Sequence, residues 1–216
     1  NKLNKEELEA QLRLKGTKFV TISFYQYAKI EDPHSFRDQL FIMWSNLEVV
    51  GRTYLATEGI NAQMSVPVKN LEKFRSELYE IDFLNEVRLN IAVEEESAEF
   101  PFLKLKVKVR KKILADGLED ESFDVTKKGK HLSAQEFNDL TNDPETILID
   151  FRNHYESEVG HFKGAVTPDV DTFRDSLPII EDEYLKGNED KNLVMYCTGG
   201  IRCEKASAWF KHRGFS

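Results

Sequence analysis

The segment Cys197-Thr-Gly-Gly-Ile-Arg-Cys203 constrains the fold of this chain more than any other. It follows an apolar run over 193–196 that predicts a short buried strand. It precedes residues 204–211, whose pattern predicts a helix closed by Gly214. A buried strand, a glycine-rich turn and a helix in this order indicate a parallel α/β domain with a site where the strand ends.

The loop between this strand and this helix predicts an anion-binding site around Cys197. Gly199 and Gly200 let backbone N–H groups turn inward, and the start of a helix adds about half a positive charge. Together with Arg202, these groups should lower the thiol pKa from about 8.5 into the range where the thiolate dominates at neutral pH. A lone cysteine before a glycine turn is more often a small buried residue, but this context favours a nucleophile. We therefore predict Cys197 as the catalytic residue of an active loop that binds anion or substrate through Thr198, Gly199, Gly200, Ile201 and Arg202.

The second cysteine, Cys203, falls in the first turn of the predicted helix. It either packs as a small residue or resolves a sulfenate or persulfide on Cys197 into a disulfide. Two cysteines six positions apart form no disulfide framework and suit a reducing cytoplasm. Because the pair lacks C-x-x-C spacing and a second ligand pair, we expect no metal site within this chain.

Polar residues of the segment 147–165 are expected beside the loop. Residues 147–149 predict a buried parallel strand, and Asp150 and Arg152 after it are expected to form a structural ion pair. His161 lies in a Gly-His-aromatic turn and is expected to bind backbone, with a catalytic role beside Cys197 as the less favoured alternative.

The segment 147–165 and the six-residue active loop resemble the first strand and the active loop of rhodanese-type sulfurtransferases. In those proteins the cysteine carries a persulfide. The related phosphatases and arsenate reductases have one loop residue more, which gives room for a tetrahedral oxyanion. The loop length therefore favours sulfur or redox chemistry over phosphate chemistry.

Length and composition indicate two domains. The 216 residues leave room for two domains of about 100 residues each. No apolar run approaches the roughly 18 residues of a membrane span, so we expect no membrane partner, and we expect no signal peptide. Residues 1–115 carry 18 Lys and Arg against 17 Asp and Glu, whereas residues 116–216 carry 12 against 21. The first half is therefore the better place to seek an anionic partner.

Residues 18–115 alternate predicted strands and helices in the order βαββαβ. This order is that of a ferredoxin-like (acylphosphatase-like) domain, in which both helices cover one face of the sheet. β-Branched and aromatic residues predict the strands, and apolar residues at helical spacing predict the helices. The expected strands cover 18–28, 49–56, 62–66 and 87–93, the expected turn covers 58–61, and the expected helices run through 36–47 and 71–78.

Residues 103–110 form a basic strand, in which apolar and basic side chains alternate so that every cation lies on one face. Its basic residues are Lys104, Lys106, Lys108 and Arg110. Such a strand is either a sheet edge kept soluble by lysines or a stripe that binds phosphates, and the residues alone favour neither. Acidic residues that can neutralise part of its charge are Glu94, Glu95, Glu96 and Glu99.

Together the two halves resemble the rhodanese-domain tRNA uridine hydroxylases. The resemblance rests on residues 57–62 (Thr-Glu-Gly-Ile-Asn-Ala), the basic strand, and residues 197–205 (Cys-Thr-Gly-Gly-Ile-Arg-Cys-Glu-Lys). It implies oxygen-dependent conversion of the wobble uridine in the tRNA anticodon loop to 5-hydroxyuridine, with Cys197 at the reacting centre. It also implies tRNA as the partner and molecular oxygen as the co-substrate, with no cofactor in this chain. Without the resemblance, the loop indicates a persulfide-carrying sulfurtransferase, and a non-enzymatic RNA-binding module is a third alternative.

The expected domain division has four parts. They are a leading polar segment over 1–17, a ferredoxin-like domain with the basic strand over 18–115, an acidic linker over 116–124, and an α/β rhodanese domain with a parallel sheet over 125–216. Members of the family continue past the active-loop helix into another strand, so we expect the rhodanese domain to be truncated here. A metal or redox partner on that remainder stays an alternative, and the expected absence of metal concerns only these 216 residues.

Overall fold

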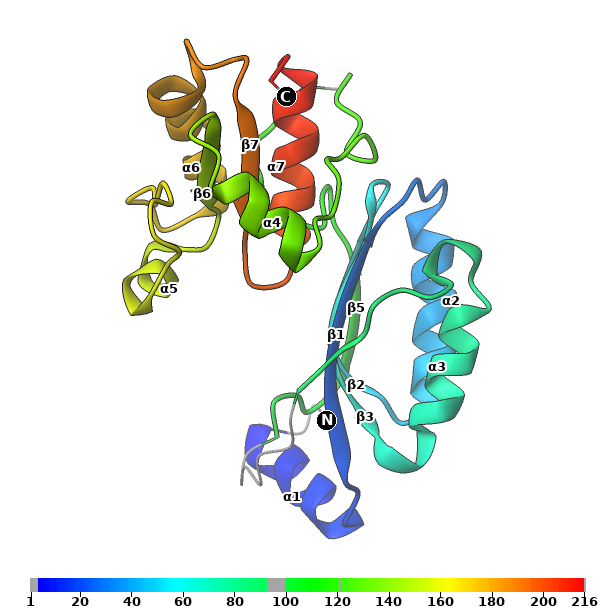
Figure 1. Ribbon diagram of the computed structural model, residues 1–216. Helices are drawn as coiled ribbons and strands as arrows, with labels where there is room; N and C mark the ends of the chain where they lie inside the picture. The colour runs from blue at the N-terminus through cyan, green and yellow to red at the C-terminus, as the bar shows by residue number, and fades with distance from the viewer. Residues whose placement is uncertain (1–3, 93–99, 121, 216) are drawn as a thin grey trace. The chain divides into compact units, whose positions relative to one another are not determined.

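The computed structural model describes residues 4–92, 100–120 and 122–215, and the chain divides into two compact units, Asn1–Ile113 and Leu114–Ser216 (Figure 1). The first unit begins with α1 (Lys5–Lys15), which starts at a capping box. The Asn4 side chain accepts from the Glu7 N–H at 2.9 Å, and the Glu7 carboxylate accepts from the Asn4 N–H at 2.8 Å. In the part of the chain just defined, no helix combines the length and the apolar character that crossing a bilayer requires.

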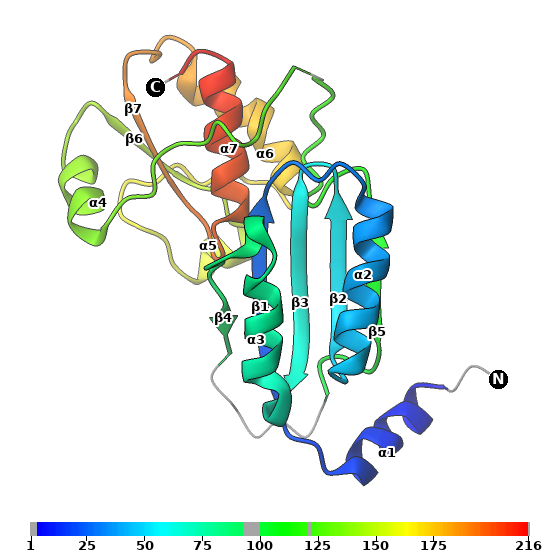
Figure 2. The same ribbon diagram turned by 90° about the vertical axis from the view of Figure 1, so that its right-hand side faces the viewer.

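The first unit is built on a five-stranded sheet with two helices on one face (Figure 2). Its strands, in the order β4-β1-β3-β2-β5, are β1 (Phe19–Tyr27), β2 (Val50–Ala56), β3 (Gly59–Pro67), β4 (Asn90–Ile91) and β5 (Leu105–Val109). β1 pairs antiparallel with β3 and β4, β2 pairs antiparallel with β3, and β5 runs parallel to β2. Its helices are α2 (Pro33–Asn46) and α3 (Leu71–Tyr79), with 3₁₀ turns at Val68–Asn70 and Asp82–Leu84. The order of the elements confirms the predicted ferredoxin-like domain, and β5 adds the basic strand at its edge.

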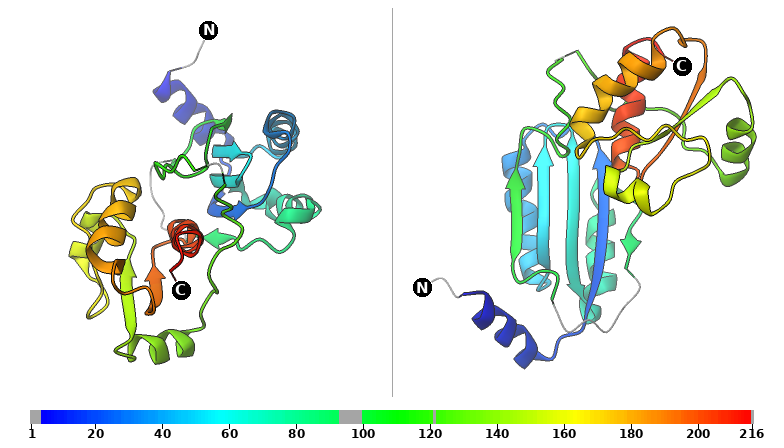
Figure 3. Two further views of the ribbon diagram at one scale, coloured as in Figure 1. Left: turned by 90° about the horizontal axis from the view of Figure 1, so that it is seen from above. Right: turned by 90° about the vertical axis from the view of Figure 1, so that its left-hand side faces the viewer.

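The core of this unit lies between the sheet and the two helices. Leu40 and Trp44 of α2 and Phe74 and Leu78 of α3 are fully buried, and each pair is four residues apart, so that it shares one helix face. Alternate residues of β1, such as Ile22, meet them from the sheet. In the right-hand view of Figure 3, α2 and α3 both lie behind the sheet, so they cover the same face.

Two strands of the first unit begin three residues away from their expected starts, whereas the others differ by one or two residues at their ends. β3 begins at Gly59, inside the expected turn, because β2 and β3 already pair between Ala56 and Gly59. The strand expected over 87–93 shortens to β4, because a turn precedes it: the Val87 N–H donates to the Leu84 carbonyl oxygen at 3.0 Å. Glu86, with a φ of 62°, is incompatible with extended backbone. Residue 93 lies outside the described residues.

The Thr-Glu-Gly-Ile-Asn-Ala stretch has a structural role at the turn between β2 and β3. Oε1 of Glu58 accepts from the Ile113 N–H at 2.8 Å, and Nδ2 of Asn61 donates to the Ile113 carbonyl oxygen at 3.3 Å. A Cβ at Gly59 would lie 2.1 Å from the carbonyl oxygen of Gln26, so only glycine lets β3 approach β1 this closely. The stretch therefore anchors the last residue of the first unit.

The second unit contains a parallel sheet of β6 (Thr146–Asp150) and β7 (Asn192–Tyr196). Its helices are α4 (Ala134–Thr141), α5 (His154–Val159), α6 (Phe173–Ile180) and α7 (Ile201–His212), with a π-helical turn at Glu181–Leu185. Ile149 and Phe151 from the end of β6 pack with Leu177 of α6 and Phe210 of α7. This α/β arrangement with a parallel sheet confirms the fold class predicted for the second half.

The acidic segment 116–124, expected as a linker, packs within the second unit. The Phe123 ring meets the Trp209 ring edge-on at a centroid distance of 5.4 Å. Oδ2 of Asp116 lies 2.6 Å from Nζ of Lys205 on α7, and both side chains are completely buried. The acidic composition indicated a linker, and Glu119, Asp120 and Asp124 are indeed exposed, but an ion pair and an aromatic contact attach the segment to α7. Residue 121 lies outside the described residues.

Removing one partner of this buried ion pair should destabilise the second unit. Asp116→Leu takes the carboxylate away from a buried ammonium group, which typically costs about 3–5 kcal/mol. The double variant Asp116→Leu/Lys205→Met replaces the pair with apolar side chains and should recover most of that loss. Urea unfolding followed by circular dichroism measures both variants. An Asp116→Leu protein as stable as the parent would show that the pair does not anchor the segment.

Candidate active site

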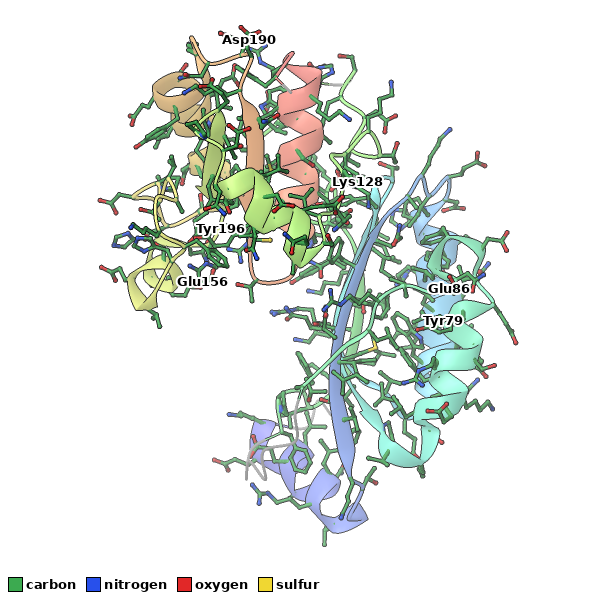
Figure 4. The ribbon with its side chains drawn as sticks, viewed as in Figure 1. Tyr79, Glu86, Lys128, Glu156, Asp190 and Tyr196 are labelled. Carbon is green, nitrogen blue, oxygen red and sulfur yellow. The ribbon has the colours of Figure 1, made fainter. Side chains whose placement is uncertain are left out.

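The active loop connects the end of β7 to the start of α7. Cys197 directly follows Tyr196, the last residue of β7, and Gly200 directly precedes α7. Gly200 has a φ of 89°, and its N–H donates to Sγ of Cys197 at 3.1 Å. Figure 4 shows Tyr196 and Glu156 at the opposite end of β7 from Asp190, which places the loop at the carboxyl edge of the parallel sheet.

The pKa of the Cys197 thiol is lowered to about 5, so the thiolate dominates at neutral pH. The largest cause is the hydrogen bond that the Cys203 thiol donates to Sγ of Cys197. Burial opposes the shift, whereas the Cys203 N–H, the charge of Arg202 and the Gly200 N–H add to it. The sequence predicted that the glycines, the helix start and Arg202 lower the pKa of Cys197. The structure adds the Cys203 thiol, which lowers this pKa the most.

Cys203 titrates in the opposite direction. Its pKa is raised well above the ordinary value, first because its thiol donates to Cys197 and then because it is buried. At neutral pH the site therefore holds a protonated thiol beside a thiolate. This proximity places Cys203 as a hydrogen-bond donor in the resting state and within reach of an oxidised Cys197.

Arg202 is held by Glu156 of α5, a carboxylate that the sequence analysis did not include in the site. Nη1 of Arg202 lies 2.9 Å from Oε1 of Glu156 and 3.4 Å from Oδ1 of Asn153. The exposed fractions of the Arg202 and Glu156 side chains are only 13% and 22%, so solvent screens the pair weakly. Burial raises the pKa of Glu156, but hydrogen bonds from Arg202, Thr198 and Asn153 lower it to about 2. Glu156 thus balances the charge that Arg202 brings to the loop.

A local signal for Glu156 is present in the sequence. Asn153 and Glu156 form a capping box at the start of α5, in which Oε1 of Glu156 accepts from the Asn153 N–H at 3.1 Å. The Thr198 hydroxyl donates to Oε2 of the same carboxylate, so the start of α5 also fixes the active loop. The Asn-x-x-Glu spacing predicts the cap, but it does not predict which arginine the carboxylate meets.

Asp150 at the end of β6 is buried and paired with Arg152. Nη2 of Arg152 lies 2.6 Å from Oδ2 of Asp150, and the Tyr196 hydroxyl donates to the same oxygen at 2.8 Å. Nη2 of Arg152 also donates to the Gly160 carbonyl oxygen at 2.6 Å. Burial raises the pKa of Asp150, but the hydrogen bonds from Arg152 and Tyr196 outweigh it and lower the pKa. This network joins the ends of β6 and β7 to the turn after α5.

His161 lies in that same turn. Its Nδ1 is 3.1 Å from the Ser157 carbonyl oxygen at the end of α5. The next residue, Phe162, reaches the tip of β7: its N–H donates to the Tyr196 hydroxyl at 3.2 Å, and the two rings meet at a centroid distance of 4.9 Å. These contacts give His161 a structural part in holding the turn.

Cys197 borders a cavity of about 480 Å³ within the second unit. Its lining residues include Cys197, Gly200, Cys203 and Glu204 from the loop and α7, Met195 and Tyr196 from β7, Phe137 and Leu140 from α4, and Lys130 and His131 before α4. Glu204 forms an ion pair with Lys128 at 2.7 Å, and its Oε1 lies 2.7 Å from Nε2 of His131. Across residues 4–92, 100–120 and 122–215, no group of three or more His, Cys, Asp or Glu side chains is placed to hold a metal ion. The cavity gives a reacting group access to the thiolate.

The basic strand belongs to the first unit. Lys104, Lys106, Lys108 and Arg110 are all exposed, whereas Val107 between them is buried. The acidic residues expected to reduce its charge, at positions 94, 95, 96 and 99, lie outside the described residues. The predicted site residues therefore fall into two groups, with residues 150–203 around the active loop and residues 104–110 on β5 and directly next to its ends.

Known proteins share both units of this chain. A family model described as the UPF0176 acylphosphatase-like domain matches residues 19–113, and the rhodanese-like domain model matches residues 133–216. The chain thus joins an acylphosphatase-like domain to a rhodanese-like domain with a cysteine-bearing active loop. Over its whole length it is similar to curated proteins named tRNA uridine(34) hydroxylase, which confirms the resemblance predicted from the motifs.

Three relatives illustrate the match. Proteins named tRNA uridine(34) hydroxylase from Leptospira interrogans, Photorhabdus laumondii and Escherichia coli strain SMS-3-5 are 51%, 48% and 49% identical to this chain. Each match covers 100% of this chain and 58%, 60% and 61% of the respective relative. The chain therefore spans about three fifths of the length of these relatives.

Alkylation of Cys197 by iodoacetamide should be half-maximal near pH 5, because the rate follows the thiolate, which forms as the pH rises through the pKa of about 5. Arg202→Ala removes a fixed cation and should raise this midpoint. As the matched control, Glu156→Gln removes a neighbouring negative charge but keeps a capping side chain, so it should not raise the midpoint. Mass spectrometry of the Cys197 peptide across a pH series measures all three proteins. An unchanged midpoint in Arg202→Ala would mean that Arg202 does not tune the thiol.

Proposed function

We propose that this chain carries the reacting centre of an enzyme that converts the wobble uridine of tRNA to 5-hydroxyuridine. The observation that carries the proposal is a Cys197 thiolate, with a pKa of about 5, at the edge of a cavity. It occurs in a chain about half identical to proteins named tRNA uridine(34) hydroxylase. The relatives' name supports the reaction, and the geometry supports Cys197 as its nucleophile.

The Cys197 thiolate can activate C5 of uridine, the carbon that is hydroxylated. A thiolate attacks electron-poor carbons, and C6 of uridine is such a carbon. Addition at C6 makes the neighbouring C5 electron-rich. Molecular oxygen, the co-substrate, then delivers one oxygen atom to C5 while the other leaves as water, with two electrons and two protons from a thiol reductant that becomes a disulfide. Loss of the C5 proton and of the Cys197 thiolate restores the C5–C6 double bond.

The neighbours of Cys197 prepare the thiolate. The Cys203 thiol and the Gly200 N–H stabilise the negative charge on sulfur. Arg202 adds a positive charge that Glu156 holds in place. If Cys197 is oxidised to a sulfenate, the Cys203 thiol can condense with it to a disulfide and release water.

The substrate of this reaction is the anticodon loop of tRNA. Its wobble base is already unpaired, so presenting it to the thiolate costs less than extracting a base from a duplex. The cations of β5 are the group we assign to phosphate contacts. We place the reaction in the cytoplasm, where both cysteines remain reduced.

The same loop supports a second candidate function, a persulfide-carrying sulfurtransferase. A low-pKa thiolate whose sulfur is stabilised by the backbone N–H groups of Gly200 and Cys203 also suits a cysteine that carries one further sulfur atom. The two functions differ in the atom that the substrate gains. An RNA-binding module without catalysis would add neither atom.

Mass spectrometry of tRNA nucleosides distinguishes these functions. In cells that lack the full protein, 5-hydroxyuridine should disappear from tRNA, and re-expression should restore it. A gain of sulfur on uridine upon re-expression would instead support the sulfurtransferase, and no change in any nucleoside would support the non-catalytic alternative.

The two cysteines should contribute unequally in the same experiment. Cys197→Ser should abolish hydroxylation, because a serine hydroxyl does not supply the thiolate. Cys203→Ser should lower it only partly, because a hydroxyl can still donate a hydrogen bond to Sγ of Cys197. A fully active Cys197→Ser protein would contradict its assignment as the nucleophile.

A further inference from the structure

One face of the sheet in the first unit is not covered by α2 and α3. Basic and aromatic side chains of β5 and β2 lie on this face. The apolar residues of β5 pack on the core, as buried Val107 shows, so the basic residues of β5 point away from the helices. The register of the parallel pair aligns Lys106 with Arg52 of β2, and Lys108 with Tyr54. Aligned residues of adjacent strands point to the same face, so Arg52 and Tyr54 share the face of the β5 cations.

The cations on this face form a compact group across two strands. Its members, all exposed, are Arg52, Lys104, Lys106, Lys108 and Arg110. Strand geometry separates Lys106 and Lys108 of β5 by about 6.6 Å, Lys104 and Arg110 directly flank the strand, and β2 lies about 4.8 Å away. The next strand, β3, aligns Gln63 with Arg52 and adds a polar side chain, whose Oε1 lies 3.5 Å from Nη2 of Arg52. Such an array presents hydrogen-bond donors at the spacing of phosphates along an extended nucleic acid strand.

Tyr54 gives this face an aromatic component. The Cζ atoms of Arg110 and Arg52 lie 5.5 Å and 5.9 Å from the centroid of its ring. The ring itself is partly exposed. Nucleobases stack on aromatic rings and on guanidinium planes, so this cluster can receive a base while the lysines contact phosphates.

We infer that this basic sheet face, defined by Arg52, Tyr54, Lys104, Lys106, Lys108 and Arg110, is a binding site for unpaired RNA. The phosphates of the strand contact the lysines, and one of its bases stacks on Tyr54 and the flanking guanidinium groups. The identification of the RNA as the loop of a tRNA rests on the proposed function. The binding site itself rests on the charge and aromatic groups of the sheet.

An unpaired strand fits this face better than a duplex. In A-form RNA the bases are stacked and their major-groove edges lie in a deep, narrow groove, so Tyr54 would have no base to receive. A duplex would contact the lysines alone. Unpaired bases, by contrast, are free to turn toward an aromatic group on an open sheet.

The charge part of the proposal is tested with a fluorescently labelled oligouridine and the full chain, by anisotropy at several salt concentrations. Replacing Lys104, Lys106 and Lys108 by Gln should weaken binding and reduce the slope of log affinity against log salt by about 0.7 per lost phosphate contact. The control variant replaces Lys69, Lys73 and Arg75 by Gln. These three cations lie in or next to α3, on the helix-covered side of the sheet, so the control should bind oligouridine like the parent. Equal affinities and slopes for the two triple variants would overturn the site.

The stacking part is tested with single changes at Tyr54. Tyr54→Leu should weaken oligouridine binding by roughly five-fold or more at an unchanged salt slope, because a stacked base is lost but no phosphate contact. Tyr54→Phe keeps the ring and should bind like the parent, and circular dichroism checks that both variants are folded. If Tyr54→Leu binds as tightly as Tyr54→Phe, or if an RNA duplex of equal length binds as tightly as oligouridine, the assignment to unpaired RNA is wrong.

Failure of this inference is distinguishable from failure of the proposed function, because binding is measured without chemistry. Suppose that the Lys104/Lys106/Lys108→Gln variant binds oligouridine like the parent and that re-expression of the parent restores 5-hydroxyuridine in cells. This result would contradict the RNA-binding site on the basic sheet face and support the proposed reaction. Weakened oligouridine binding in that variant, together with no oxygen gain on tRNA when the parent protein is re-expressed, would support the RNA-binding site and contradict the proposed reaction.

Discussion

The lowered pKa of Cys197 depends first on the hydrogen bond from the Cys203 thiol to the sulfur of Cys197. This hydrogen bond makes the largest contribution to lowering the pKa of Cys197 to about 5. It forms only if the chain turns at Gly200 into α7. The turn brings a thiol of the first helical turn back toward the end of β7. Burial favours the neutral thiol, so the thiolate persists because donors surround the sulfur where water is reduced.

Buried or half-buried ion pairs hold the elements that present this sulfur. Glu156 and Arg202 join α5 to the loop, Asp150 and Arg152 join β6 to the turn at residue 160, and Lys205 fixes α7 to the segment at Asp116. Each charge has its counter-charge within hydrogen-bond distance, which reduces the cost of burying it. The loop therefore combines a stabilised anion with a rigid frame.

Patterns that depend on near neighbours in the sequence predicted most of the fold. The alternation of strands and helices, the apolar run before Cys197 and the cap-forming glycines all act over a few residues. The attachment of the segment 116–124 to α7 was not predictable, because Asp116 meets Lys205 across 89 positions of the chain. The pairing of Arg202 with Glu156 was not predictable for the same reason. The capping box at Asn153 predicts one contact of the Glu156 carboxylate, but not its second contact, with Arg202. The late start of β4 was not predictable either, because the turn that ends in the Val87–Leu84 hydrogen bond includes a positive φ at Glu86, for which a glutamate gives no signal.

The most direct test of Cys203 as the main stabiliser of the thiolate is an ultraviolet titration of the Cys197 thiolate in the parent and in Cys203→Ala. Alanine keeps the backbone N–H and a small side chain but removes the thiol donor. The midpoint should rise clearly above the parent value of about 5, because the largest favourable interaction is lost. A midpoint that stays near 5 in Cys203→Ala would contradict this origin of the thiolate and assign it to the loop backbone and Arg202 alone.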